Sequence, residues 1–98
     1  VNKELFGYIG SEQISALVQQ FVQNPLNHQL LEELENLLRK YYDLGAHLHL
    51  WYSQNIIYQI GLQQYFLRTR LAEKGQESAA HWVERFKTVS NLLGVKLD

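Results

Sequence analysis

The sequence has no cysteine, only one proline and almost no net charge, and each of these absences excludes a class of function. Without cysteine the chain can form no disulfide, no thiolate nucleophile and no thiolate metal site. Nine Lys and Arg residues stand against ten Asp and Glu residues, so the net charge of −1 provides no electrostatic basis for binding nucleic acid or an acidic membrane. No apolar run approaches the roughly 20 residues that span a bilayer. We expect a cytoplasmic protein that binds neither nucleic acid nor a membrane.

The residues that are present favour helices. Leu, Gln and Glu are abundant, and 98 residues suffice for one domain with one hydrophobic core. In the first ten residues Gly7 and Gly10 interrupt the apolar side chains, which predicts an irregular arm or a short turn of helix. Four helices are predicted over about 11–23, from Pro25 or Asn27 to Gly45, over 48–74, and from 77 or 78 to 93. Because the connections are short, residues 1–98 are expected to form an all-α, four-helix antiparallel bundle.

Cap residues and glycines predict where these helices begin and end. Ser11 is placed as the N-cap of the first helix, and Asn27 is suited to cap the second. Residues 46–50 alternate in polarity and are predicted to form an extended connection or the first turn of the next helix. Glu35 and Arg39 have the spacing of a favourable surface pair. The predicted stops are Gly45, Gly75 and Gly94.

The stretch 48–74 is the segment around which we expect the chain to fold. It holds one of the two Trp residues, and its apolar positions scatter around the helical wheel. A helix that is apolar over most of its circumference is usually buried by several neighbours. Trp51, Ile57 and Ile60 are therefore predicted to be interior, whereas Trp82 is placed at the edge of the last apolar stripe. Gly61 costs roughly 1 kcal/mol relative to Ala inside a helix, which indicates a kink or the close approach of another element.

The polar residues form no recognisable reactive site. His47 and His49 are the only closely spaced histidines, and on a helix they point about 200° apart, so they cannot bind one ion. Ser11 and Ser78 are explained as helix caps, and no base is placed to activate either. The acidic candidates line one outer helix face instead of a cleft: Glu32, Glu33 and Glu35. We predict no catalytic residue, no metal and no cofactor in this chain.

Aromatic residues interleaved with amides are the feature most open to a functional interpretation. A ring supplies a flat apolar surface and an amide supplies hydrogen bonds, so such a set can bind a sugar or a protein surface. Helical spacing places most of the rings in the core. The residues predicted to reach an outer face are Tyr52, Tyr58 and Tyr65. In the N-terminal arm, the candidates for a domain interface are Phe6, Tyr8 and Ile9.

Three segments, 24–38, 48–58 and 79–97, together resemble the helical C-terminal region of certain large bacterial proteins. The N-terminal half of those proteins looks like a family 57 glycoside hydrolase of the alpha-amylase and alpha-mannosidase type. The resemblance is carried by a Leu-Trp-x-x-Gln-Asn pattern and a Trp-x-x-x-Phe pattern, matched here by Leu50, Trp51, Gln54, Asn55, Trp82 and Phe86. It implies a C-terminal accessory domain of a cytoplasmic carbohydrate-active protein. No catalytic motif of that family is matched, so the implied role is packing against the catalytic barrel.

Other functions stay open at this point. The chain begins with Val1, and we expect it to be a segment of a longer protein whose remainder is its main partner. A free-standing interaction module that forms a homodimer through its amphipathic helices is the alternative. A small helical enzyme or ligand carrier would need His47 or His49 to converge with Tyr and amide side chains around Trp51 in a concave pocket.

Overall fold

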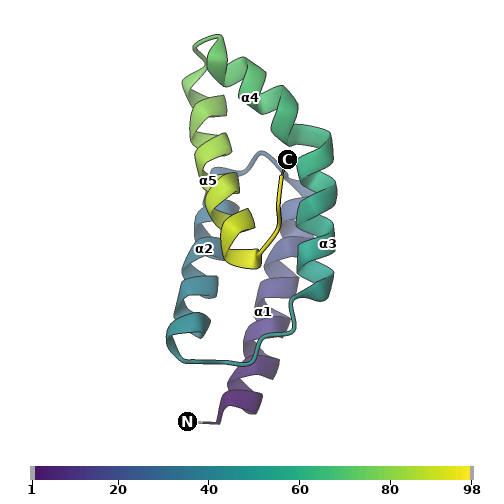
Figure 1. Ribbon diagram of the computed structural model, residues 1–98, viewed down its shortest axis with the longest axis vertical. Coiled ribbons are helices and arrows are strands. Elements are labelled where there is room, and N and C mark those ends of the chain that lie inside the picture. The colour runs from purple at the N-terminus through teal and green to yellow at the C-terminus, as the bar shows by residue number, and fades with distance from the viewer. Residues whose placement is uncertain (1, 98) are drawn as a thin grey trace.

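The computed structural model describes residues 2–97, which form four helical stretches joined by short links (Figure 1). The third stretch is continuous but changes form, because the five-residue π-helical segment η1 joins α3 to α4. Within residues 2–97 there is no strand, so the predicted all-α bundle of four helices is confirmed. The elements are α1 Lys3–Gln23, α2 His28–Asp43, α3 Trp51–Ile60, η1 Gly61–Tyr65, α4 Phe66–Glu73 and α5 Glu77–Leu93.

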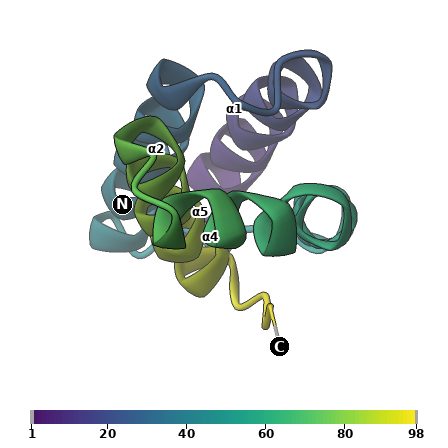
Figure 2. The same ribbon diagram turned by 90° about the horizontal axis from the view of Figure 1, so that it is seen from above.

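Successive helices run in opposite directions, but the link between α2 and α3 crosses the end of the bundle (Figure 1). As a result α2 and α5 are parallel neighbours, so that residues later in α2 contact residues later in α5. His28 lies 3.4 Å from the Ser78 hydroxyl, and Glu32 lies 3.7 Å from the Arg85 guanidinium one to two turns further on. α1 and α3 also run in the same direction, and α4 crosses from the end of α3 towards α5 (Figure 2).

The first ten residues are helical, so the prediction of an irregular arm was wrong. α1 begins at Lys3 and is capped by Asn2, whose side-chain oxygen accepts the N–H of the residue three positions later. Ser11 was also wrongly placed as a cap, since it lies inside α1. Its hydroxyl donates to the Gly7 carbonyl oxygen at 2.6 Å and accepts the His49 N–H at 2.8 Å. Ser11 thus ties the crossing link to α1.

Close packing of that link explains the two glycines that made the arm look irregular. A methyl group built on Gly7 would overlap the His47 carbonyl oxygen and lie 2.7 Å from its carbonyl carbon. A methyl on Gly10 would lie 2.8 Å from the Leu48 side chain. Residues 46–50 belong to no helix or strand and form a connection into α3, and the His47 N–H donates to the Lys3 carbonyl oxygen at 3.2 Å. Backbone-to-backbone packing therefore outweighs the low helix propensity of glycine here.

Every helical stretch except the α4 segment contributes a buried apolar face to one core. Trp82 lies at the centre and not at the edge as predicted, because its ring stacks on Phe86 with centroids 4.6 Å apart. The buried indole is also satisfied, since Nε1 donates to the Pro25 carbonyl oxygen at 2.7 Å. The remaining members of the core include Ile14, Val18, Phe21, Leu31, Leu34, Leu38, Ile57, Ile60, Val89 and Leu93.

The central stretch is buried on one side only. Ile57 and Ile60 are interior, as predicted, but Trp51 is 76% exposed, so its predicted burial was wrong. α3 contacts α1 and α5 with one face, and its opposite face has no neighbour among the described residues. Gly61 is buried where the π-helical segment begins, and a methyl there would lie 3.1 Å from the Leu97 side chain. The stretch therefore has both a change of helical form and a close contact at Gly61.

Backbone geometry confirms the predicted cap Asn27 and the predicted glycine stops. Ser78 was wrongly predicted as a cap, since it lies inside α5, whose N-cap is Gln76. Asn27 caps α2 by accepting the Leu30 N–H at 3.0 Å. The predicted stops have the positive φ values of 67°, 95° and 77° that favour glycine: Gly45, Gly75 and Gly94. After the last of these the tail folds back, and Val95 is buried against the core.

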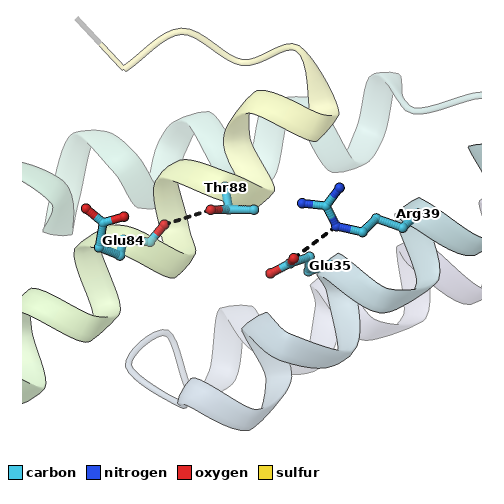
Figure 3. Close-up of polar contacts among 4 residues, drawn as sticks. All are labelled: Glu35, Arg39, Glu84 and Thr88. Carbon is cyan, nitrogen blue, oxygen red and sulfur yellow. Dashed lines mark hydrogen bonds and ion pairs between the residues drawn. The ribbon is translucent and has the colours of Figure 1, made fainter.

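Surface pairs follow helical spacing on the outer sides of α2 and α5. Figure 3 shows the predicted pair, in which Arg39 Nε lies 3.0 Å from the Glu35 carboxylate. It also shows the Thr88 hydroxyl donating to the Glu84 carbonyl oxygen at 3.1 Å. Such exposed pairs contribute little to stability. They mark these sides of α2 and α5 as ordinary solvated surface.

Candidate functional site

The outer face of the α3–η1–α4 stretch carries a group of exposed apolar side chains. Trp51, Leu62 and Phe66 are 76%, 63% and 69% exposed, and three further large apolar residues beside them are also exposed. No charged residue occurs between Leu50 and Leu67. We call this surface the aromatic face and define it by Trp51, Tyr52, Tyr58, Leu62, Phe66 and Leu67.

Three exposed amide side chains follow the aromatic face along the same stretch. Asn55, Gln59 and Gln63 recur every four residues, so they lie on neighbouring turns. An amide both donates and accepts hydrogen bonds, whereas a carboxylate only accepts and an ammonium only donates. The face therefore combines large apolar area with polar groups that can pair with groups of their own kind.

The predicted outward-facing tyrosines divide into two sets. Tyr52 and Tyr58 belong to the aromatic face. Tyr65 is partly buried on the inner side of the same stretch, with its ring centroid 6.2 Å from that of Phe86. It borders an open hollow of about 520 Å³ between α5 and the C-terminal tail, together with Lys87 and Asn91. The structure thus brings Tyr52 and Tyr58 together and separates Tyr65 from them.

The candidates near the N-terminus lie on a different helix. Tyr8 is 66% exposed and Leu5 is 51% exposed, while Phe6 and Ile9 are partly buried. They surround the side of α1 that faces away from the crossing link, because Gly7 occupies the side that faces it. We call this second surface the α1 face and define it by Leu5, Phe6, Tyr8 and Ile9.

The histidines do not converge on a pocket. His47 Nδ1 lies 2.8 Å from the Glu4 carboxylate, and both side chains are exposed. An open hollow of about 350 Å³ lies beside Tyr58 and Asn55, but neither His47 nor His49 borders it. Residues 2–97 contain no group of three His, Cys, Asp or Glu side chains placed to hold a metal ion. None of the described helices is long and apolar enough to span a bilayer.

Tyr42 makes a long-range contact that the sequence pattern did not single out. Its hydroxyl donates to the Leu92 carbonyl oxygen in the last turn of α5. Partial burial raises the pKa of Tyr42 above its usual value, because the charged phenolate would lose solvation there. The contact satisfies a carbonyl that has no partner within its own helix.

Most residues that carry the family resemblance hold the bundle together. Trp82 and Phe86 stack in the core, and Leu50 packs against it. The Gln54 amide donates to the Leu93 carbonyl oxygen at 2.7 Å, which fastens α3 to the end of α5. Asn55 donates to the Trp51 carbonyl oxygen at 2.7 Å inside α3. The Trp51 indole is the exception, since it points into solvent.

No protein-family model, no curated protein and no solved structure matches this chain. The two exposed apolar faces are therefore the features from which function can be argued. Sequence analysis missed Leu62, Phe66 and Leu67 as members of the aromatic face, because uncharged helical residues were interpreted as core. For Leu62 and Phe66 the signal is their position opposite Ile57 on the helical wheel, whereas Leu67 lies on the side of Ile60 and carries no such signal.

Proposed function

We propose that this chain is a non-catalytic helical accessory domain that packs against the catalytic part of a glycoside hydrolase-like protein. The proposal is supported by the positions of the residues that carry the resemblance, because most of them lie in the core or join two helices. Trp82 and Phe86 stack in the core, and Gln54 joins α3 to the end of α5. A pattern of this kind specifies a scaffold and not a reaction. The bacterial source and cytoplasmic location implied by the resemblance belong to the same proposal.

The α1 face is the surface that we assign to the parent protein. Leu5 and Tyr8 are more than half exposed on α1. Burying a large apolar side chain contributes about 1.5–3 kcal/mol, so the two side chains are suited to anchor a domain contact. In Figure 1 the beginning of α1 extends past the crossing link, which leaves this end of the helix open to contact. The sequence-based candidates Phe6 and Ile9 flank the same anchors.

The experiment begins with the reading frame upstream of the Val1 codon, which we expect to encode a barrel with a pair of catalytic carboxylates. The upstream part is then produced separately and titrated with this chain by calorimetry. We expect binding, and we expect Leu5→Asp to weaken it at least about tenfold, because a charge would be desolvated in the contact. The matched control is Phe66→Asp, an exposed apolar position on another helix, which should leave binding unchanged.

Two results would overturn this assignment. One is a reading frame with no hydrolase-like region, which would remove the parent protein. The other is binding that Leu5→Asp leaves intact and Phe66→Asp abolishes, which would move the contact from the α1 face to the aromatic face. Circular dichroism of both variants verifies that the bundle is folded in each titration.

A further inference from the structure

We infer that the aromatic face binds a second copy of this chain, with the two α3–η1–α4 stretches antiparallel and the two-fold axis at Gln59. This contact is independent of the α1 face and of the proposed parent protein. A two-fold interface uses the same surface on both copies, so the surface must match itself when its direction is reversed. The two ends of the aromatic face meet this requirement.

Four of the six residues of the aromatic face are placed symmetrically about Gln59, whereas the counterparts of Tyr58 and Leu62 are the buried Ile60 and the partly buried Ile56. Seven and eight residues before Gln59 stand Tyr52 and Trp51, and seven and eight residues after it stand Phe66 and Leu67. All four side chains are exposed. In an antiparallel pair centred at Gln59, Trp51 therefore faces Leu67 of the second copy, and Tyr52 faces Phe66. Each end of the contact joins a large aromatic ring to an apolar partner.

The amides repeat this symmetry. Asn55 and Gln63 lie four residues before and four residues after Gln59. Asn55 then faces Gln63 of the second copy, while Gln59 faces its own equivalent. Amides can satisfy one another because each has donors and an acceptor, whereas a carboxylate or an ammonium meeting its own copy would repel it. A surface that pairs with its own copy must avoid like charges that face each other, and no charged residue occurs from Leu50 to Leu67.

Charge also determines the relative direction of the two copies. Arg68 and Arg70 follow the uncharged stretch at one end only. A parallel pair would place like arginines side by side, which is unfavourable. In the antiparallel pair Arg70 lies eleven residues from the axis in each copy, so its two copies lie at opposite ends of the contact.

The available area matches that of a specific dimer. With roughly 200 Å² for each fully exposed large side chain, the six apolar residues of the aromatic face offer about 700 Å². The largest apolar patch of an ordinary monomer is about 300–600 Å², and a standard interface buries about 800 Å² on each partner. The flanking amides supply the remainder.

A change of direction at the end of η1 lies inside the contact, since Phe66 and Leu67 are the first two residues of α4. Beyond it α4 leans away from the α3 direction towards α5 (Figures 1 and 2). The exposed apolar residues end at Leu67, and the charged residues begin at Arg68. The apolar part and the uncharged part of the stretch therefore end together at Leu67, which limits the contact to residues 51–67.

Sedimentation equilibrium of the 98-residue chain tests the pairing. We expect a monomer–dimer equilibrium with a micromolar or tighter dissociation constant. Trp51→Asp and Phe66→Asp should each weaken it at least about 25-fold, because each substitution enters the symmetric contact twice and costs at least about fivefold each time. Leu5→Asp, a comparable charge on the α1 face, should leave the constant unchanged. A chain that stays monomeric at all accessible concentrations overturns the inference, as does equal weakening by all three variants.

Cysteine pairing tests the geometry directly, because the natural chain has no cysteine to interfere. A disulfide requires Cα atoms within about 7 Å, a separation that the antiparallel contact provides only near its axis. Gln59→Cys should therefore form a covalent dimer under mild oxidation, while Arg70→Cys should not. Efficient cross-linking of Arg70→Cys together with failure of Gln59→Cys would refute the antiparallel arrangement. The cross-linking test uses neither aspartate variant, so it remains valid even if one of them is poorly folded.

Discussion

Gly7→Ala is the substitution that most directly tests the packing of the crossing link on α1. In an isolated helix this change would stabilise the helical form by about 1 kcal/mol. Here the new methyl group would overlap the His47 carbonyl oxygen and lie 2.7 Å from the carbonyl carbon. Because both atoms belong to the backbone, no change of side-chain rotamer can relieve the overlap. The link must move away from the helix.

The expected loss of stability follows from what that movement breaks. Overpacking of this kind costs about 1–3 kcal/mol. Moving the link also disturbs the bond from the His47 N–H to the Lys3 carbonyl oxygen and the bond from the His49 N–H to Ser11, each worth about 1 kcal/mol. After subtraction of the propensity gain, Gly7→Ala should lower the free energy of unfolding by about 2–4 kcal/mol. That is a large share of the 5–15 kcal/mol typical of a domain.

Urea denaturation followed by circular dichroism measures the effect, and Gly61→Ala is the matched control. A methyl on Gly61 would lie 3.1 Å from Leu97 Cδ2, the tip of a side chain in the tail that can shift. Gly61→Ala should therefore be neutral or stabilising by up to about 1 kcal/mol. If Gly7→Ala proves as stable as the natural chain, or more stable than Gly61→Ala, the link does not press on α1 as described.

Two further substitutions test single contacts by the same denaturation assay. Asn27→Ala removes the side-chain oxygen that caps α2 and should lower the free energy of unfolding by about 1 kcal/mol. A change below a few tenths of a kcal/mol would mean that the cap does not stabilise α2. Tyr42→Phe removes the bond to the Leu92 carbonyl oxygen and should also cost about 1 kcal/mol. Because the pKa of Tyr42 is raised in the fold, the unfolded chain loses that proton first, so stability should fall as pH rises above about 10. Tyr42→Phe should reduce this alkaline loss, and an unchanged pH profile would contradict the assignment.

Local chemistry made the helix ends predictable. Asn27 caps α2, and Gly45, Gly75 and Gly94 have the positive φ values expected of stops, because caps and turns depend on a few neighbouring residues. The prediction failed at Gly7, where a contact with a link some 40 residues away decides the backbone. No local pattern contains that contact. The arm that seemed irregular is for this reason the first two turns of α1.

The candidate site was only partly predictable for a related reason. Apolar periodicity placed Ile57 and Ile60 correctly in the core. The same criterion misplaced Trp51. Apolar residues on both sides of a helix do not distinguish a helix buried within its own chain from one that exposes one side to a partner. Tyr52 and Tyr58 were correctly predicted to reach the outer face. Trp82 was misplaced because its position on the helical wheel was the only criterion. The stacking of its ring on Phe86, which places it in the core, was not foreseen.

The crossing link has a consequence for the order in which the chain folds. It divides the molecule into two helical hairpins, α1 with α2 and α4 with α5, each closed by a short loop and rich in local contacts. Local contacts form fast, whereas the parallel contacts of α1 with α3 and of α2 with α5 require the hairpins to dock. We therefore expect docking to be the rate-limiting step, so that loosening the link at Gly7 slows refolding as well as accelerating unfolding.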